Sequence, residues 1–287
     1  MKRILVTGAN GQLGKTFRAM ESTYPGVKFT FAGRDEIDIA QPDSVQMMIA
    51  LKPDFIINCA AYTQVDKAET DKKSAKLINE TGARHLVEAA ASADSVLIHY
   101  SSDYVYHIKK KGPLKESDPK KPQGIYAKTK WRGDKIVATY KKHIILRTSW
   151  VFAEEGANFV NTMIKLGENR DSLNIVDDQW GAPTFTRDLV AATMTIIDTL
   201  MLHPGKRYYG TYNYSNEGLV SWYDFATAIF DLKGKKMHLG KTSTAAYNAP
   251  APRPHWSHMS KNKFKKTFKA EIPHWYDALR RCLKAQE

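Results

Sequence analysis

The 287-residue sequence is poor in cysteine and lacks any long uninterrupted run of apolar residues. Its two cysteines, Cys59 and Cys282, are too few for a disulfide framework, and such sparse use is typical of a reducing compartment. No apolar stretch approaches the roughly 20 residues of a membrane-spanning helix. The apolar part of residues 1–8 is too short for a signal peptide. We therefore expect a cytoplasmic protein without a membrane-spanning segment.

Acidic side chains are in the minority, with 30 Asp and Glu against 43 Lys and Arg, so the formal net charge is +13. This excess is compatible with nucleic acid, a membrane surface or an anionic small molecule as the partner. Residues 107–143 contribute most of it, with 12 basic and 3 acidic side chains. No aromatic stacking motif or recognised binding module accompanies the charge. We expect neither nucleic acid nor a membrane as partner, which leaves an anionic small molecule.

The pattern of apolar segments predicts an α/β fold. Hydrophobic residues make up 43 % of the chain, which is too many for a disordered protein, and the length suits one or two domains. The expected strands and helices alternate along the chain, with strands at residues 4–6, 28–32, 55–57, 95–100 and 143–147 and helices at residues 13–20, 45–51, 75–91 and 126–140. This alternation is typical of a Rossmann-type, doubly wound parallel sheet.

Three glycines follow the first expected strand and open the first expected helix. The segment reads Gly8-Ala9-Asn10-Gly11-Gln12-Leu13-Gly14. Glycine permits a tight turn and lets the backbone approach a pyrophosphate, while the amides and the positive end of the helix face the anion. The segment predicts a dinucleotide-binding turn, with a plain strand-to-helix turn as the alternative.

The end of the second expected strand bears on which dinucleotide binds. A NAD-specific site places an acidic residue there, about 20 residues after the glycine turn, against the ribose 2′-hydroxyl. Here the strand ends with Arg34 followed by Asp35, and a guanidinium would bind the 2′-phosphate of NADPH. Asp38 and Ile39 follow closely and are expected near the adenosine. We predict NADPH as the cofactor and leave the use of NADH open.

A tyrosine and a lysine four residues apart predict the catalytic group. On a helix, Tyr126 and Lys130 share one face. A Lys ammonium ~4 Å from the phenol favours the phenolate by about 4 kcal/mol at an effective dielectric of about 20, which would lower the tyrosine pKa by roughly 3 units. Ser102, at the end of the fourth expected strand, would hold a carbonyl oxygen. A proton donor and a hydroxyl beside a hydride source reduce a ketone, or oxidise an alcohol in reverse.

These residues resemble the motifs of the extended short-chain dehydrogenase/reductase family, and the similarity covers essentially the whole chain. The segments that carry it are residues 6–14, 58–69, 102–105, 178–184, 221–225 and 253–254. Two features, the tyrosine at position 62 and the Asp-Gln-x-Gly-x-Pro-Thr pattern at residues 178–184, resemble the sequences of sugar-nucleotide 4-ketoreductases rather than those of epimerases. The resemblance implies reduction of the 4-keto group of dTDP-4-dehydro-β-L-rhamnose to dTDP-L-rhamnose, with hydride from NADPH and the proton from Tyr126.

Composition changes after about residue 150, where strands become shorter and proline and aromatic residues more frequent. We expect an NAD(P)-binding Rossmann domain at residues 1–150, completed by part of residues 175–200. Residues 151–287 would form mainly a smaller substrate-binding domain. In an open α/β sheet the ligand lies beyond the carboxyl ends of the strands, where the second domain could close over it.

The resemblance implies further site residues by position. Ser102 stands where the family has a catalytic threonine, next to the catalytic pair Tyr126 and Lys130. The sugar is expected to contact Thr63, Val65, Asp103, Tyr104 and Trp150. The cofactor is expected to contact Gly8, Asn10, Gly11, Gln12, Leu13, Gly14, Arg34, Asp38, Ile39, Ala60, Ala61, Tyr62, Tyr126 and Lys130. Arg253 could bind the substrate diphosphate through a bidentate pair, or form a structural salt bridge.

Two segments depart from the family pattern. The chain reads Tyr104-Val105-Tyr106-His107-Ile108 where members commonly continue Tyr-Val-Phe-Asp-Gly, which leaves the shape of the loop at residues 106–111 open. Some members bridge a dimer through Mg²⁺ with a Glu on the first helix, where this chain has Lys15-Thr16. We therefore predict no metal ligand, and leave a Mg²⁺ requirement and a homodimer open.

Two alternatives to the reductase hypothesis remain. The chain could be another sugar-nucleotide reductase, or an epimerase or dehydratase that retains a tightly bound NAD⁺. It could also be a regulatory subunit that keeps the fold without catalysis, although the presence of Ser102, Tyr126 and Lys130 argues against this.

Overall fold

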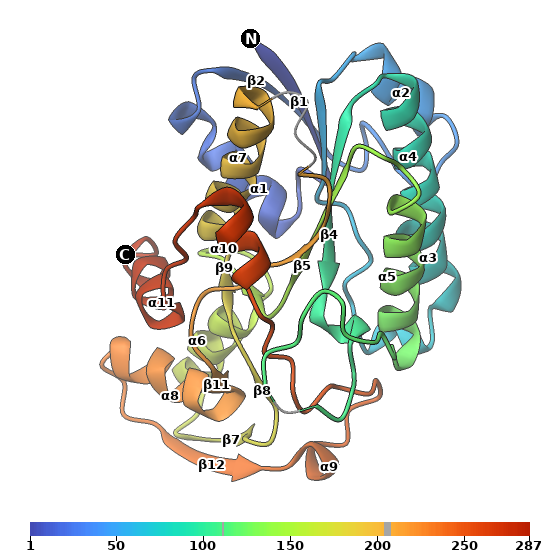
Figure 1. Ribbon diagram of the computed structural model, residues 1–287. Coiled ribbons are helices and arrows are strands. Elements are labelled where there is room, and N and C mark those ends of the chain that lie inside the picture. The colour runs from blue at the N-terminus through green and yellow to red at the C-terminus, as the bar shows by residue number, and fades with distance from the viewer. Residues whose placement is uncertain (111, 204–207) are drawn as a thin grey trace.

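A six-stranded parallel sheet forms the centre of the computed structural model, which describes residues 1–110, 112–203 and 208–287 (Figure 1). In spatial order its strands are β10 (Gly210–Asn213), β5 (His143–Thr148), β4 (Val96–Ser102), β3 (Phe55–Asn58), β1 (Lys2–Thr7) and β2 (Val27–Ala32). Chain order reverses at β1, which lies between β2 and β3. A ligand crevice is expected beyond the carboxyl end of the strand at such a reversal. The predicted doubly wound α/β fold is confirmed.

Helices cover both faces of the sheet because successive strand residues point to opposite faces and are apolar on both. Val6 of β1 shares a core with Phe17 and Leu189, whereas the adjacent Leu5 shares another with Leu86. The first face is covered by α1 (Gln12–Ala19), α7 (Thr186–Leu202) and α10 (Asn262–Phe268), and the second by α2 (Ser44–Ala50), α4 (Gly82–Ser92) and α5 (Gly124–Val137) (Figure 1).

The helix expected at residues 75–91 is interrupted, so the prediction of one continuous helix is wrong. The segment forms α3 (Lys72–Lys76), a π-helical turn η3 (Leu77–Thr81) and then α4. In the widened turn, Asn79 accepts from the Tyr62 amide at 3.0 Å and donates to Thr129 Oγ1 at 3.1 Å. Such turns are typical of functional sites. Here the turn ties the segment after β3 to α5.

A second hydrophobic core lies beyond the carboxyl end of the sheet (Figure 1). Phe152, Phe185, Phe225 and Leu279 lie in it, each almost completely buried. The small sheets around it in the described chain are β6 (Val151–Phe152) with β9 (Thr184–Phe185), β7 (Ser172–Val176) with β12 (His238–Thr242), and β8 (Trp180–Gly181) with β11 (Val220–Ser221). The helices of this part are α6 (Phe159–Asn169), α8 (Trp222–Leu232), α9 (Thr244–Tyr247) and α11 (Trp275–Lys284). Because α7, β10 and α10 return to the main sheet, the two parts alternate along the chain.

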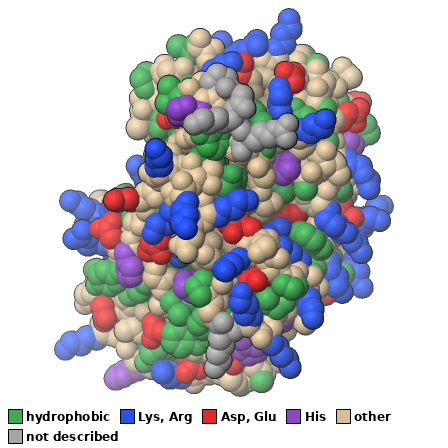
Figure 2. Space-filling view, in the orientation of Figure 1, with side chains coloured by type: hydrophobic (Ala, Val, Ile, Leu, Met, Phe, Trp, Pro, Cys, Tyr) green, Lys and Arg blue, Asp and Glu red, His purple; other side chains and the backbone are tan. Residues whose placement is uncertain are grey.

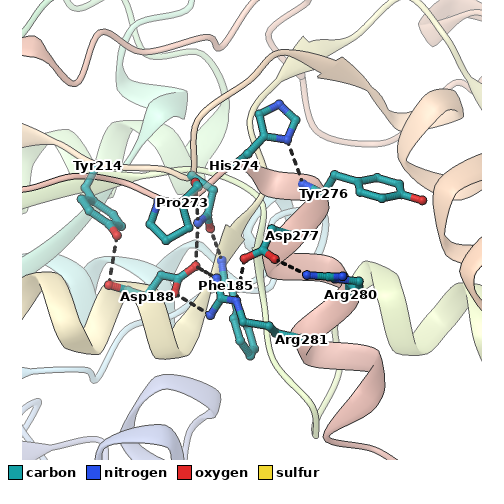
Figure 3. Close-up of polar contacts among 10 residues, drawn as sticks. Phe185, Asp188, Tyr214, Pro273, His274, Tyr276, Asp277, Arg280 and Arg281 are labelled. Carbon is teal, nitrogen blue, oxygen red and sulfur yellow. Dashed lines mark hydrogen bonds and ion pairs between the residues drawn. The ribbon is translucent and has the colours of Figure 1, made fainter.

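A charged cluster joins α7 of the main sheet to α11 of the second core (Figure 3). Arg281 donates to Asp188 Oδ1 at 2.9 Å and to Asp188 Oδ2 at 2.8 Å. Asn216 donates its side-chain amide to Asp188 Oδ2 at 2.6 Å and to the Pro273 carbonyl at 3.1 Å. Asp188 is buried, so the pair links the two parts from within the molecule. We call Asp188, Asn216 and Arg281 the α7–α11 clasp.

The surface carries mixed charges. Figure 2 shows Lys and Arg side chains spread over one face with Asp and Glu between them, rather than gathered into one basic patch. No helix in the described ranges is long and apolar enough to cross a bilayer. Residue 111, within the altered loop at residues 106–111, lies outside the described residues.

Candidate active site

A cleft of about 800 Å³ lies beyond the carboxyl ends of β1, β4 and β5. Ala153 just after β6, Arg187 on α7 and Ala285 just after α11 also contribute to its wall. The predicted site residues that line the cleft are Asn10, Gly11, Gln12, Leu13, Ala61, Thr63, Val65, Ser102, Asp103, Tyr104, Tyr126, Lys130 and Trp150. The structure therefore brings predicted cofactor, catalytic and sugar contacts to one place.

The glycine turn after β1 depends on contacts that a side chain would block. Gly8 has a φ of +66°, and a Cβ atom there would lie 2.5 Å from the Ala60 nitrogen. A Cβ atom on Gly14 would lie 2.5 Å from the Gly8 carbonyl oxygen. The turn therefore packs directly on the segment after β3, and α1 begins at Gln12 behind Gly11. The unpaired amides of this first helical turn fit a pyrophosphate.

Arg34 and Asp38, which are both expected near the adenosine of the cofactor, form an ion pair at the surface. Arg34 Nε lies 3.3 Å from Asp38 Oδ2, just after β2. The Arg34 side chain is 76 % exposed, so its guanidinium can meet a 2′-phosphate with little desolvation. Ile39 is buried in the core under α4, where it packs against Gly82. The side chain of Ile39 therefore serves the core rather than the surface.

Ser102, Tyr126 and Lys130 meet in the cleft. Ser102 ends β4, and the other two lie on one face of α5. Lys130 is buried, and its Nζ donates to the Tyr100 carbonyl oxygen at 2.7 Å. The Ser102 hydroxyl donates to Asp103 Oδ1 at 3.0 Å. A hydroxyl, a phenol and an ammonium thus surround one region of the cleft, as general acid chemistry at a carbonyl requires.

The protonation state of Tyr126 differs from the expectation. Burial raises the pKa of Tyr126 to about 12, and the Ser102 hydroxyl only partly opposes this. The Lys130 ammonium is bonded to the Tyr100 carbonyl, and burial lowers the pKa of Lys130 to about 8. The pKa of Tyr126 is therefore shifted in the direction opposite to the expected fall, because burial is the largest cause and Asp103 and Asp134 add to it. A phenol that stays protonated at neutral pH is suited to donate a proton, which is what reduction needs.

A buried carboxylate, Asp103, borders the same region. Burial raises the pKa of Asp103 to about 6, against the opposing effect of the Ser257 and Ser102 hydroxyls. Among the described residues, Asp103 Oδ2 has no hydrogen-bond partner. An orphaned buried acceptor beside a cleft is suited to bind a ligand hydroxyl.

Trp150 lines the cleft and stacks on Trp222, which does not line it. The rings of Trp150 and Trp222 lie 3.5 Å apart at an angle of 8°. Trp150 has a φ of +49°, which non-glycine residues rarely adopt, and a Cβ atom on Gly181 would lie 2.9 Å from its ring. Trp222 donates its ring N–H to Gln179 Oε1 at 3.1 Å. The supported ring of Trp150 offers a flat apolar face to a sugar or a base.

A second cavity, of about 660 Å³, adjoins the cleft at Tyr104, which lines both. Arg253, Tyr247 and Trp222 lie in its wall. Arg253 Nη1 and Nη2 donate to Asp66 Oδ1 and Oδ2 at 3.0 and 2.7 Å. Of the two roles foreseen for Arg253, the salt bridge is present, and the position in the cavity wall is compatible with the diphosphate contact as well.

The start of α5 is held by Glu69, on a short turn η2 (Lys67–Glu69). Glu69 Oε1 accepts from the Ile125 amide at 2.7 Å, one residue before Tyr126. A carboxylate at this position satisfies an unpaired helix amide and complements the helix dipole. The loop after β3 therefore both carries predicted ligand contacts and positions the helix of Tyr126.

Some predicted residues do not line the cleft, and some lining residues escaped prediction. Gly8, Gly14 and Ala60 support the glycine turn, Tyr62 and Ile39 are buried, and Arg34, Asp38 and Arg253 lie beyond the cleft lining. Arg187 and Ala285 line the cleft and Trp222 lines the second cavity, and none of the three was predicted. Asp66, which pairs with Arg253, and Glu69, which holds the start of α5, line neither cavity and were not predicted either. Asp66 and Glu69 lie in the segment that carried the resemblance, whereas α7 and α11 reach the cleft through packing that no local signal reveals. Within the described residues, no group of three or more His, Cys, Asp or Glu side chains could hold a metal ion.

The chain is similar to known proteins over almost its full length. A family model described as the RmlD substrate binding domain matches residues 1–287. A dTDP-4-dehydrorhamnose reductase from Aggregatibacter actinomycetemcomitans is 39 % identical, over 98 % of each chain. The solved dTDP-4-dehydrorhamnose reductase from Bacillus anthracis, in complex with NADP, has a TM-score of 0.93 at 35 % identity and covers 99 % of this chain and 100 % of that one. The corresponding structure from Clostridium acetobutylicum has a TM-score of 0.92 at 35 % identity, over 99 % of each chain.

Proposed function

The chain belongs to the RmlD substrate binding domain family, and from this we propose that it reduces dTDP-4-dehydro-β-L-rhamnose to dTDP-L-rhamnose with NADPH. The observation that carries the proposal is the meeting of Ser102, Tyr126 and Lys130 in a cleft that begins at the glycine turn. The proposal includes a cytoplasmic location, in keeping with the two cysteines, which are free thiols in the described chain.

The glycine turn supports the cofactor assignment. Side chains at Gly8 and Gly14 would fill the space that the backbone needs to turn into α1, so the cradle fits a pyrophosphate. The relative from Bacillus anthracis was solved with NADP. When bound, NADPH supplies the hydride that the carbonyl carbon receives.

Tyr126 supplies the proton in the proposed reaction. As the C4 carbonyl oxygen gains negative charge, the phenol donates to it, and the raised pKa of about 12 ensures that the phenol carries its proton at neutral pH. The Ser102 hydroxyl turns its single hydrogen from Asp103 Oδ1 to the same oxygen and orients the carbonyl. The Lys130 ammonium stabilises the phenolate that remains.

The sugar and the nucleotide have separate supports in this proposal. Asp103 Oδ2 accepts from a sugar hydroxyl, and Trp150 offers its ring face. Thr63 and Val65 border the sugar from the loop after β3. Arg253 pairs with the diphosphate from the second cavity.

The purified protein is expected to oxidise NADPH only when dTDP-4-dehydro-β-L-rhamnose is present. The fall in NADPH absorbance measures the rate, and mass spectrometry of the sugar nucleotide identifies the reduced product. A lack of turnover with a verified substrate contradicts the proposal. Isolation with one equivalent of bound NAD⁺, together with an isomerised sugar and no NADPH consumption, would favour the epimerase alternative.

Replacement of Arg34 with Ala is expected to raise the KM for NADPH about tenfold and to leave the KM for NADH nearly unchanged. The guanidinium contributes about 1.5–3 kcal/mol through charge-assisted bonds that only the 2′-phosphate offers. Steady-state kinetics with both cofactors measure the effect. Arg84→Ala, an exposed arginine on α4, is the control. An equal rise for NADPH and NADH counts against a contact with the 2′-phosphate.

A further inference from the structure

A buried ion pair lies behind the catalytic lysine. Asp134 stands one helical turn after Lys130 on α5, and its Oδ2 lies 3.1 Å from Arg147 Nε on β5. The two side chains are 1 % and 4 % exposed. The desolvation of such a pair can exceed the gain from pairing, so it is weak evidence for a role in stability alone.

Asp134 and Lys130 are both buried and lie four residues apart on α5, so their side chains share one face of the helix. Burial lowers the pKa of Lys130, and Asp134 opposes this by raising it. Burial raises the pKa of Asp134 in turn, and Arg147 and the Ser101 hydroxyl oppose that effect. His99 is buried beside Lys130 with a pKa well below its usual value, so its imidazole is neutral.

The groups that the structure places at Lys130 lie on β4 and on α5. His99 and the Tyr100 carbonyl come from β4, and Asp134 comes from α5 itself. Tyr126 and Asp103, on η4 (Asp103–Val105), line the same cleft as Lys130. Glu69 and Glu80 contact α5 elsewhere, through the Ile125 amide and the Arg132 guanidinium. Asp134 is therefore the carboxylate that favours the cationic lysine among the described residues.

The Arg147 side of the pair is anchored by the hydroxyl of Tyr106. Arg147 Nη1 donates to the Tyr106 hydroxyl at 3.0 Å, and that hydroxyl donates to Asn213 Oδ1 at 2.8 Å. The Tyr106 hydroxyl therefore holds a second nitrogen of the guanidinium and links it to β10.

We propose that Asp134 is a positioning residue that keeps Lys130 cationic, and that Arg147, held by Tyr106, shares the Asp134 carboxylate with the lysine. The inference rests on the proposed function, in which the Lys130 ammonium stabilises the phenolate left by Tyr126. Asp134 touches neither substrate nor cofactor, because it is buried behind the lysine and does not line the cleft.

Two substitutions with opposite effects on the lysine test the proposal. In Asp134→Asn the lysine loses its counter-ion, so its pKa should fall by roughly one unit or more. In Arg147→Gln the Asp134 carboxylate is no longer shared between Arg147 and Lys130, so the pKa of Lys130 should rise. The pH dependence of kcat reports the change: wild type should lose rate above about pH 8, Asp134→Asn at lower pH, and Arg147→Gln at higher pH. The KM values should change little.

A direct measurement separates this inference from the proposed function. The ¹³C shift of the Lys130 side chain, assigned with Lys130→Arg, titrates without any substrate. Glu80→Gln, which loses a carboxylate paired with Arg132 on another face of α5, should titrate as wild type does. Asp134→Glu keeps the charge and should restore the wild-type pH profile. If the pKa of Lys130 shifts in opposite directions in Asp134→Asn and Arg147→Gln but the protein does not turn over the sugar nucleotide, the proposed function is contradicted and the role of Asp134 is not.

The proposal is overturned by shifts of the same sign in Asp134→Asn and Arg147→Gln, or by no shift in either. A shift of equal size in Glu80→Gln would overturn it as well. If Asp134→Asn does not fold, the rise in Arg147→Gln and the wild-type profile of Asp134→Glu decide the matter.

Discussion

Replacement of Tyr126 with Phe is expected to lower kcat by about 10²- to 10⁴-fold and to leave the affinity for NADPH unchanged. The substitution removes the hydroxyl that donates the proton. It keeps the ring, which packs edge-on against Tyr104 with the ring centroids 5.6 Å apart. The glycine turn is formed by other elements and should not respond. NADPH oxidation with the sugar nucleotide measures the first quantity, and fluorescence titration with NADPH measures the second.

The matched control for this substitution is Tyr276→Phe. Tyr276 is an exposed tyrosine on α11, outside the lining of both cavities described for the site. It loses the same hydroxyl and should keep the wild-type rate. If Tyr126→Phe also kept the wild-type rate, the catalytic assignment would be wrong, and the hypothesis of a regulatory subunit would gain support.

Five of the six strands of the sheet could be predicted because apolar runs, such as Phe55-Ile56-Ile57 in the fully buried β3, stand out in a sequence. The sixth strand, β10, has no such run and was not predicted. The π-helical turn could not be predicted in the same way. The groups that bind Asn79 there, the Tyr62 backbone and Thr129, lie 17 and 50 residues away along the chain. Local periodicity carries no information about such partners.

The same distinction applies to the site. The glycine turn and the pair Tyr126 and Lys130 are local patterns, so the sequence was sufficient to predict them. The stacking of Trp222 on Trp150 joins distant segments and was not foreseen. The pKa of Tyr126 was predicted in the wrong direction because a pairwise charge argument omits burial, which depends on the packing of the whole cleft.

The α7–α11 clasp connects the stability of the fold to the walls of the cleft. Arg187 and Leu189 flank Asp188 on α7 and line the cleft, and so does Ala285, just after α11. Figure 3 shows Arg281 between two carboxylates, those of Asp188 and Asp277. Arg281 therefore holds α11 against the helix that forms one side of the cleft.

Replacement of Asp188 with Asn is expected to lower the free energy of unfolding by about 2–4 kcal/mol. Loss of one partner leaves the other charge of a buried pair uncompensated, which costs about 3–5 kcal/mol when both are fully buried. Here Asp188 is buried, but the Arg281 side chain is 39 % exposed, so water recovers part of the loss. The thermal midpoint should fall by roughly 4–16 °C, at 2–4 °C per kcal/mol for a chain of this order of size.

Asp277→Asn provides the control because its carboxylate accepts from the same guanidinium, from Arg281 Nε at 2.9 Å. The Asp277 side chain is 43 % exposed, and an ion pair in contact with water contributes about 0–1 kcal/mol. Thermal unfolding and urea titration should therefore show a severalfold larger loss of unfolding free energy in Asp188→Asn than in Asp277→Asn. Equal losses would mean that burial of Asp188 adds nothing to the clasp, and that α11 is held by its apolar face alone.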